Sequence, residues 1–296
     1  MLAKSVFADP VLDADAAVFR ENFDRHSFAF KHRLAGHPLF EFDRLLTLAK
    51  KMAQTPGAVY YDAGDIKIDQ RWDQTPVGDL PIDELLHRIE TAGAWVILRR
   101  AEIDPEYAAL LDECIAEIGE MSGLDLGKMM KLRNAIIFVN SPNRVSTYHI
   151  DRECNCLLQL RGTKELHVFD REDREVLPEE EIERFWAVDN NAAQYKPHLE
   201  NRARVYQLVP GSAVHIPVNN PHWVLNGPEV SVSISVNFHY RDTYLADLYR
   251  ANYYLRRVGL KPMPPKRSTL VDNLKRTTFG LAKGLRQTVG RPMRNG

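Results

Sequence analysis

The sequence predicts a mainly β domain, a barrel or sandwich, with helical segments on both sides of it. From Asn134 onward, short runs of apolar and β-branched residues alternate with Gly, Pro, Asn and Asp, which is typical of such all-β folds. Before and after this block, apolar residues recur at three- and four-residue spacing, which indicates helices. We therefore divide the chain into an N-terminal extension (1–125), a β core (126–240) and C-terminal helices (241–296).

The composition is that of an ordinary folded protein of 296 residues, with 44% hydrophobic and 27% charged residues. These values exclude disordered and collagen-like classes. No apolar stretch approaches the roughly 20 residues that a transmembrane helix needs, and the first residues lack the apolar segment of a signal peptide. The cysteines Cys114, Cys154 and Cys156 do not have zinc-finger spacing, and we expect free thiols in a cytoplasmic protein.

The N-terminal extension is predicted to be largely helical. Residues 10–55 have the pattern of one or two helices, and Pro81 is placed to begin another that ends at Gly93. A strand at 94–98 and a helix at 105–119 follow. Tyr60–Asp62 and residues 70–72, which lie before Pro81, are expected in an irregular segment, where a substrate-facing loop is one interpretation.

Within the β core, we expect strands at 135–139, 154–160, 165–169, 205–209, 213–216 and 230–238. The residues 160–163 have the sequence of a hairpin turn, and Pro210-Gly211 marks a second turn. Helices are predicted at 242–258 and at about 269–284. The segment from Leu255 to the end holds eleven Lys or Arg and one acid, a net charge of +10, so it either contacts an anionic partner or forms a solvated helix.

Three side chains of the β core have the chemistry of a metal site. His149 and Asp151 are two residues apart, so in an extended chain both point to the same face. A third ligand is available at His222, just beyond the strand at 213–216. Two histidines and one carboxylate form the facial triad of non-haem iron(II), which leaves positions open for a cosubstrate and oxygen. A His-x-Asp pair alone is a weak signal, and its position among predicted strands strengthens it.

The motifs around these residues resemble those of the JmjC and cupin-like 2-oxoglutarate oxygenases, including the asparaginyl hydroxylase that inhibits hypoxia-inducible factor. The resemblance covers about residues 130–240 and rests on 146–155, 159–164, 210–217, 221–223 and 231–238. Two positions depart from the pattern: Ser212-Ala213 stands where an acidic residue is usual, and Asn219-Asn220-Pro221 replaces an aromatic pair. These departures concern substrate specificity more than the metal.

The resemblance implies a double-stranded β-helix, of the jelly-roll or cupin type, that binds Fe(II) and uses 2-oxoglutarate and O2. Lys164 would then pair with the distal carboxylate of 2-oxoglutarate, and Ser146 or Thr147 would donate a hydroxyl to it. Asn155 and Asn237, on strands where Asn is disfavoured, would be amides near the metal. His215 is interpreted as a structural histidine, and the thiols of Cys154 and Cys156 as core residues.

The expected reaction is hydroxylation of a C–H bond in a protein side chain or small molecule, or N-demethylation through the same step. A non-catalytic cupin and a zinc hydrolase or lyase are the alternatives, and neither explains an inward-facing Lys164 beside a complete triad. Fold resemblance alone does not decide function. The family also implies a homodimer formed through the C-terminal helices, whose apolar positions exceed what one barrel flank covers.

Overall fold

The computed structural model describes residues 9–289 except Val77 and Asp79, and the side chains of 281–289 are not described. The chain forms two compact units, one made of Met1–Val176 with Gln194–Arg241 and the other of Leu177–Ala193 with Asp242–Gly296. The first contains all the strands and the second contains helices α6 to α8. The three-part division drawn from the sequence stays a prediction.

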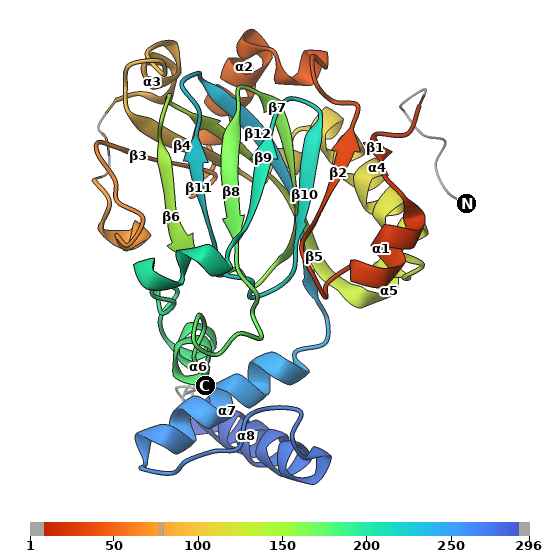
Figure 1. The fold of residues 1–296 in the computed structure, drawn as a ribbon, viewed down its shortest axis with the longest axis vertical. Helices are drawn as coiled ribbons and strands as arrows, with labels where there is room; N and C mark the ends of the chain where they lie inside the picture. Colours follow the sequence, from red (N-terminus) through yellow and green to blue (C-terminus); the bar gives the residue numbers. More distant parts are fainter. Residues whose placement is uncertain (1–8, 77, 79, 290–296) are drawn as a thin grey trace, which may run out of the picture. The chain divides into compact units, whose positions relative to one another are not determined.

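The first unit is built on an eight-stranded antiparallel sheet (Figure 1). In spatial order its strands are β1 (Leu12–Asp13), β2 (Phe28–His32), β10 (Ser212–Ile216), β7 (Cys154–Arg161), β12 (Ser231–Tyr240), β5 (Met130–Asn140), β4 (Ala94–Arg99) and β3 (Val59–Ala63). A second sheet of four strands has the order β6 (Val145–His149), β11 (His222–Asn226), β8 (Lys164–Val168) and β9 (Arg204–Leu208). The two sheets form the double-stranded β-helix that the family resemblance implied.

The predicted hairpin at 160–163 is wrong. β7 pairs with β10 and β12, whereas β8 pairs with β11 and β9, so the turn carries the chain from one sheet to the other. Gly162 is in the left-handed region (φ 68°), and a Cβ at this position would lie 2.6 Å from the backbone oxygen of Val230. The glycine thus allows the turn and a close backbone approach. Local turn sequence does not reveal that the flanking strands belong to different sheets.

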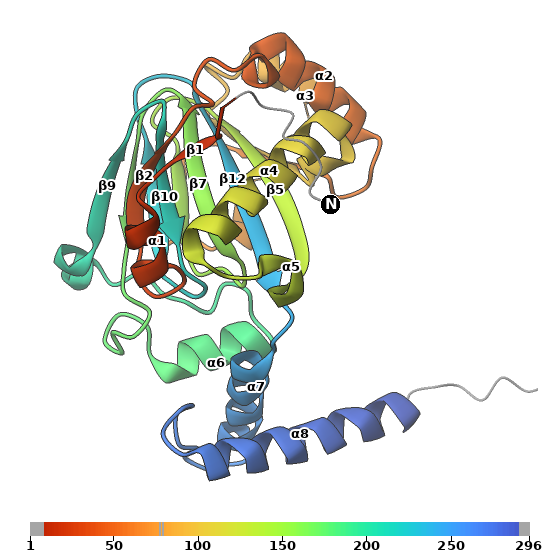
Figure 2. The ribbon, with the colours of Figure 1, turned by 90° about the vertical axis from the view of Figure 1, so that its right-hand side faces the viewer.

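Two hydrophobic cores hold the first unit together. A small core between the sheets joins Leu157, Val214 and Ile216 of the large sheet to Leu166, Val168, Leu208 and Val224 of the small one. A larger core packs the other face of the eight-stranded sheet against helices, as Figure 2 shows for α1, α4 and α5. The helices of this unit are α1 (Ala16–Asn22), α2 (Phe42–Ala53), α3 (Ile82–His87), α4 (Pro105–Ser122) and α5 (Leu126–Met129), with short 3-10 helices η1 (Pro38–Phe40), η2 (Trp72–Gln74), η3 (Ala101–Ile103) and η4 (Pro197–Arg202).

The N-terminal extension contributes strands as well as the expected helices. The helical interpretation of residues 10–55 is wrong at β2, where the side chains alternate between buried and exposed in the two-residue period of a strand. β2 pairs with β10 and so extends the large sheet. Tyr60–Asp62 likewise belong to β3 rather than to an irregular segment. Elsewhere the predicted elements agree well, since β4 covers 94–98 and α4 begins at Pro105, capped by Asp104.

The second unit consists of α6 (Glu179–Ala187), α7 (Tyr244–Arg257) and α8 (Thr269–Val289), of which the last two were predicted. Glu183 is fully buried and accepts hydrogen bonds from Arg256. Lys275 donates to the carbonyl of Met263. Two basic residues of the cationic C-terminal segment are therefore bound internally, and the part of that segment beyond Val289 lies outside the described residues. Across the described chain, no helix has both the length and the apolarity to span a membrane.

A buried ion pair ties the edge of the large sheet to the start of the small one. Asp62 on β3 accepts a hydrogen bond from the guanidinium of Arg144, and both side chains are at most 3% exposed. Arg144 precedes β6 and its carbonyl accepts hydrogen bonds from Asn226. Removing one member of such a pair leaves a desolvated charge behind, which costs far more than losing an exposed pair.

We therefore expect Asp62→Ala to lower the free energy of unfolding by about 3–5 kcal/mol. The matched control is Asp112→Ala, because Asp112 pairs with Arg133 at the surface, where side-chain exposures of 56% and 41% imply a loss below about 1 kcal/mol. Chemical denaturation of both variants measures the difference. Equal losses would show that the Asp62 pair is not a structural tie.

Candidate metal centre

Strand β11 brings the candidate ligands together because it pairs with β6 on one side and β8 on the other. His222 is opposite His149 on β6 and opposite Val168 on β8. The register with β6 shifts by one residue between His222 and Val224, so Ser146 is opposite Val224. Such a bulge lets two residues an odd number of positions apart face the same side. His149 and Ser146 both face the interior between the sheets as a result.

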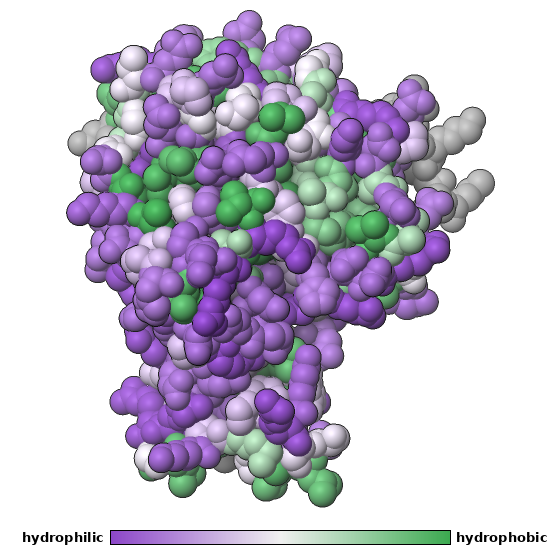
Figure 3. Space-filling model, viewed as in Figure 1, coloured by the Kyte–Doolittle hydropathy of each residue, from purple (hydrophilic) through white to green (hydrophobic). Residues whose placement is uncertain are grey.

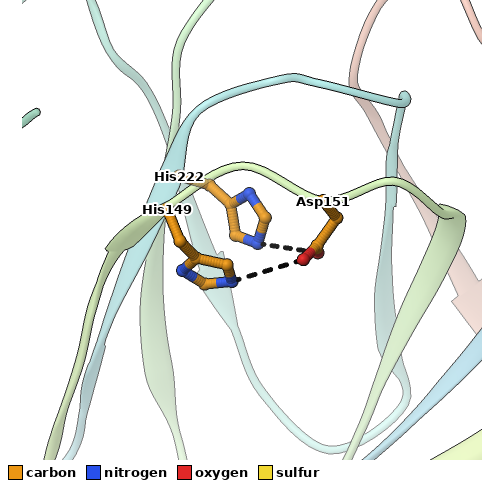
Figure 4. Close-up of side chains that lie close together, drawn as sticks. All are labelled: His149, Asp151 and His222. Carbon is orange, nitrogen blue, oxygen red and sulfur yellow. Dashed lines mark ion pairs between the residues drawn. The ribbon is translucent and has the colours of Figure 1, made fainter. Parts of the chain in front are cut away.

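The three predicted ligands converge in the structure (Figure 4). His149 Nε2 lies 3.8 Å from one Asp151 oxygen, and His222 Nε2 lies 3.6 Å from the other. One ligand atom from each of the three residues falls within 4.8 Å of the other two. Asp151 follows the end of β6, and its carbonyl oxygen accepts a hydrogen bond from the backbone of Asn219. The predicted His-x-Asp and His222 set is therefore brought to one point.

The hydrogen bonds of the two imidazoles prepare both rings for a cation. His149 Nδ1 lies 2.7 Å from the carbonyl oxygen of Thr147, and His222 Nδ1 lies 2.9 Å from that of Asn220. Because a carbonyl oxygen only accepts, Nδ1 must carry the proton and Nε2 presents a lone pair. Each Nε2 lone pair thus lies under 4 Å from an oxygen of the same carboxylate. This donor set suits a divalent transition metal, which would remove the repulsion among them.

Burial sets the protonation of the ligands. Desolvation lowers the pKa of His222 to about 3, and the nearby His149 adds to this effect, so His222 is neutral at pH 7. Burial raises the pKa of the Asp151 carboxyl to about 6, while His149 opposes the shift. Both groups are consequently in their metal-binding forms near neutral pH. His222 is 5% exposed, so this side of the site is closed to solvent.

A row of three asparagines crosses the large sheet beside Asp151. Asn155 on β7 is opposite Asn237 on β12, which is opposite Asn134 on β5. Asn155 Nδ2 donates to Asp151 Oδ2 at 3.4 Å, and Asn237 Oδ1 accepts from Ser235 at 2.7 Å. The two predicted amides thus lie where an outer layer around a metal would be. Asn134 was missed by the sequence interpretation, although an Asn next to a β-branched strand was a usable signal.

Lys164 enters the same interior from the first position of β8. It is 4% exposed, and its ammonium donates to Ser233 Oγ on β12 at 2.9 Å. Burial lowers the pKa of Lys164 to about 7. No carboxylate among the described residues comes within 4 Å of this ammonium. Of the two hydroxyls predicted near it, Ser146 faces inward opposite Val224, whereas Thr147 contributes its carbonyl to His149.

Other chemically capable residues have structural roles. His215 is fully buried, accepts from the backbone of Asp24 at 2.9 Å and bonds the carbonyl of Asn155 at 3.0 Å. Both nitrogens are therefore used within the protein. Cys114, Cys154 and Cys156 are free and buried, in keeping with the predicted core thiols. Their burial holds the thiol pKa of each above its usual value.

Comparison with solved structures identifies proteins of the same fold. A crystal structure of YcfD from Escherichia coli matches with a TM-score of 0.55 and 17% identity, covering 95% of this chain and 69% of that one. A structure of the same protein, described as a ribosomal oxygenase in complex with cobalt and 2-oxoglutarate, matches with a TM-score of 0.51 and 16% identity over 95% and 68%. No protein-family model and no curated protein matches the sequence. At these identities the similarity establishes the fold.

We expect Asp151→Ala and His222→Ala to weaken binding of Mn(II) or Co(II) by more than about 100-fold, because each removes one of three ligands. The matched control is His198→Ala, since His198 is exposed on η4 and does not belong to the candidate ligand group, so its loss should leave affinity unchanged. Isothermal titration calorimetry measures all three. Retained affinity in both ligand variants would show that the metal binds elsewhere.

Proposed function

We propose that the protein is an Fe(II)- and 2-oxoglutarate-dependent oxygenase that hydroxylates a C–H bond of a protein side chain or small molecule. The observation that carries the proposal is the buried ammonium of Lys164, which shares its interior with the His149–Asp151–His222 set and has only a hydroxyl partner. A buried cation without a counter-ion is costly unless a ligand supplies the anion. A dicarboxylate that also chelates the metal meets both needs.

In this proposal His149, His222 and Asp151 would hold Fe(II), a metal that this donor set suits. The bound metal with 2-oxoglutarate and O2 supplies the oxidising power for C–H hydroxylation, and loss of an N-methyl group follows when that carbon is bonded to nitrogen. Lys164 and Ser146 bind the distal carboxylate. Asn155 orients Asp151 through its amide, and Asn237 continues the polar row beside it. The apolar core between the sheets limits water at the deep end.

The structural match supports the choice of cosubstrate. YcfD, which shares the fold, has been crystallised with cobalt and 2-oxoglutarate and, in another structure with a TM-score of 0.50, with cobalt and succinic acid. Carrying these ligands over to this chain is part of the proposal. The rival functions, a non-catalytic cupin or a zinc hydrolase, leave the buried Lys164 ammonium without a purpose. The cytoplasmic location stays a prediction.

Lys164→Met should weaken 2-oxoglutarate binding about 30- to 150-fold, because a desolvated charged hydrogen bond contributes roughly 2–3 kcal/mol. Mn(II) affinity should stay unchanged, since the triad is intact. Lys31→Met, which alters an exposed lysine on β2, is the matched control. Titration of 2-oxoglutarate into Mn(II)-loaded protein measures the effect, and unchanged binding in Lys164→Met would assign the anchor to another residue.

The same titration repeated across pH tests whether the positive charge of Lys164, and not only the shape of its side chain, contributes to 2-oxoglutarate affinity. Because burial lowers the pKa of free Lys164 to about 7, the amine is charged below that pH and neutral above it. A bound carboxylate favours the charged form, so affinity is full below pH 7 and falls by up to about tenfold per pH unit above it. Lys164→Met should lose this dependence. A pH-independent affinity in the wild-type protein would contradict an ionic anchor.

We also propose that the protein forms a homodimer through its second unit. The buried side of α7 packs within the chain through Ala246, Leu248 and Tyr249. Large apolar side chains are nevertheless exposed in the same unit, and Figure 3 shows separate hydrophobic side chains among hydrophilic ones in the region of α7 and α8. Leu270 is 84% exposed and Leu274 66%. Two large apolar side chains exposed one helical turn apart suggest an interface, and two-fold pairing is the commonest arrangement.

Replacing both Leu270 and Leu274 with Arg should convert a dimer to a monomer, because the interface would then have to bury four guanidinium groups without partners. Multi-angle light scattering at micromolar concentration reports the mass. Leu132→Arg, at a position of the first unit that is 61% exposed, should leave the dimer intact. A monomeric wild-type chain removes the proposal.

A further inference from the structure

One part of the large sheet lines the interior and has no role in the proposed binding of metal and 2-oxoglutarate. We call it the inner wall. It consists of Tyr60, Trp95, Arg99, Ile136 and Phe138, on β3, β4 and β5. Residues directly opposite in neighbouring strands share a face. Phe138 is opposite Ser233, the partner of Lys164, and Ile136 is opposite Ser235 and Arg99. The side chains of the inner wall therefore face the same interior as the metal ligands.

The register places the inner wall alongside the proposed cosubstrate. Lys164 contacts the row of Ser233, and the metal ligand Asp151 contacts the row of Asn155 and Asn237. A molecule that bridges these two rows lies over β7 and β12, and β5 is the next strand, at a spacing of about 4.8 Å. All five members of the inner wall are only half-buried. A substrate carbon near the metal would have the inner wall beside it.

Arg99 gives the inner wall a positive charge that no acidic side chain of the described residues neutralises. Its guanidinium lies over the ring of Tyr60, 5.2 Å from the centroid, and among the described residues no carboxylate is within 4 Å of it. Asp62, an acidic residue on the same face of β3, is already paired with Arg144. A guanidinium stacked on an aromatic ring keeps its edge free for a bidentate contact with a carboxylate or phosphate.

Asn134 adds a second polar group without a partner, at the end of the inner wall beside the candidate metal ligands. It is opposite Asn237, and its Oδ1 atom is buried without a hydrogen-bond partner. A buried acceptor of this kind costs free energy until a donor reaches it. Arg99 is diagonal to Asn134, one strand across and two residues along, so the two Cα atoms are roughly 8 Å apart. A ligand that satisfies both has an N–H near the metal and an anionic group farther out.

We propose that the inner wall binds the primary substrate, with Arg99 selecting a carboxylate and Asn134 positioning an N–H beside the reacting carbon. This inference rests on the proposed oxygenase function and names its substrate class as an acidic amide. The carboxylate comes either from an Asp or Glu side chain of a peptide or from a small N-acyl amino acid. Arg99 acts as a specificity residue, and Asn134 as a positioning residue.

The test compares matched substrate pairs with the Fe(II)-loaded full chain. One arm uses random-sequence peptides containing a fixed Asp or Glu against the same peptides with Asn or Gln. The other uses N-acyl amino acids against their C-terminal amides. Incorporation of one oxygen, followed by mass spectrometry, should favour the acidic member of one arm, with a KM about 10- to 100-fold lower than that of its amide. The arm that responds identifies the source of the carboxylate.

Arg99→Gln should abolish this preference and leave Mn(II) and 2-oxoglutarate affinity unchanged. Arg100→Gln is the matched control, because Arg100 is the exposed neighbour outside the inner wall. Asn134→Ala should leave KM for the acidic substrate nearly unchanged but raise the ratio of succinate released to product hydroxylated, which a purely structural role would not do.

Two outcomes overturn the inference by different routes. Equal KM values for each pair, or a preference that survives Arg99→Gln, would overturn it while succinate release from 2-oxoglutarate still supports the oxygenase. Absence of succinate in every sample would overturn the proposed function, and the inference with it. Measuring succinate in the same reactions therefore separates the two failures.

Discussion

The pairing of one strand, β11, with two neighbours determines the geometry of the whole site. His222 at one end is opposite His149, and Asn226 at the other end is opposite Lys164. The distance between the metal ligands and the lysine is therefore set by the length of one strand, about 13 Å for four residues. A slip of one residue would turn His222 and Lys164 to opposite faces, so the register of β11 is a condition for function.

Most strands and the same-face placement of His149 and Asp151 could be predicted from the sequence because both depend on local patterns. Alternating or apolar runs identified most strands, and the two-residue spacing of His149 and Asp151 identified two of the three candidate ligands. Prediction from the sequence failed for features that depend on the pairing of strands distant in the sequence. The residues 160–163 look like a hairpin turn, but which strands pair is decided by β10 and β12. Arg99 and Asn134 acquire meaning only when β4, β5 and β12 are placed in register.

Both polar and apolar side chains line the interior between the two sheets. Uncharged amides and hydroxyls, such as Asn237 and Ser235, bond to one another and so need no counter-ion. Besides the Asp62–Arg144 pair, three charged side chains of this interior have a proposed ligand: Asp151 the metal, Lys164 the cosubstrate and Arg99 the substrate. Because charge in such surroundings is expensive, each of these groups is best explained by what it binds. The paired Arg144 and Asp62 show how the same fold treats a structural charge.

The position of β6 at the edge of the small sheet has a consequence for stability. On the described chain β6 pairs with β11 alone, apart from one backbone bond from Tyr148 to the carbonyl of Ile68. His149 and Asp151 belong to this border, whereas His222 belongs to the interior strand. An ion bound by all three side chains would link the edge strand β6 to the interior strand β11. Its binding free energy would count toward folding, and the apoprotein would open first along that border.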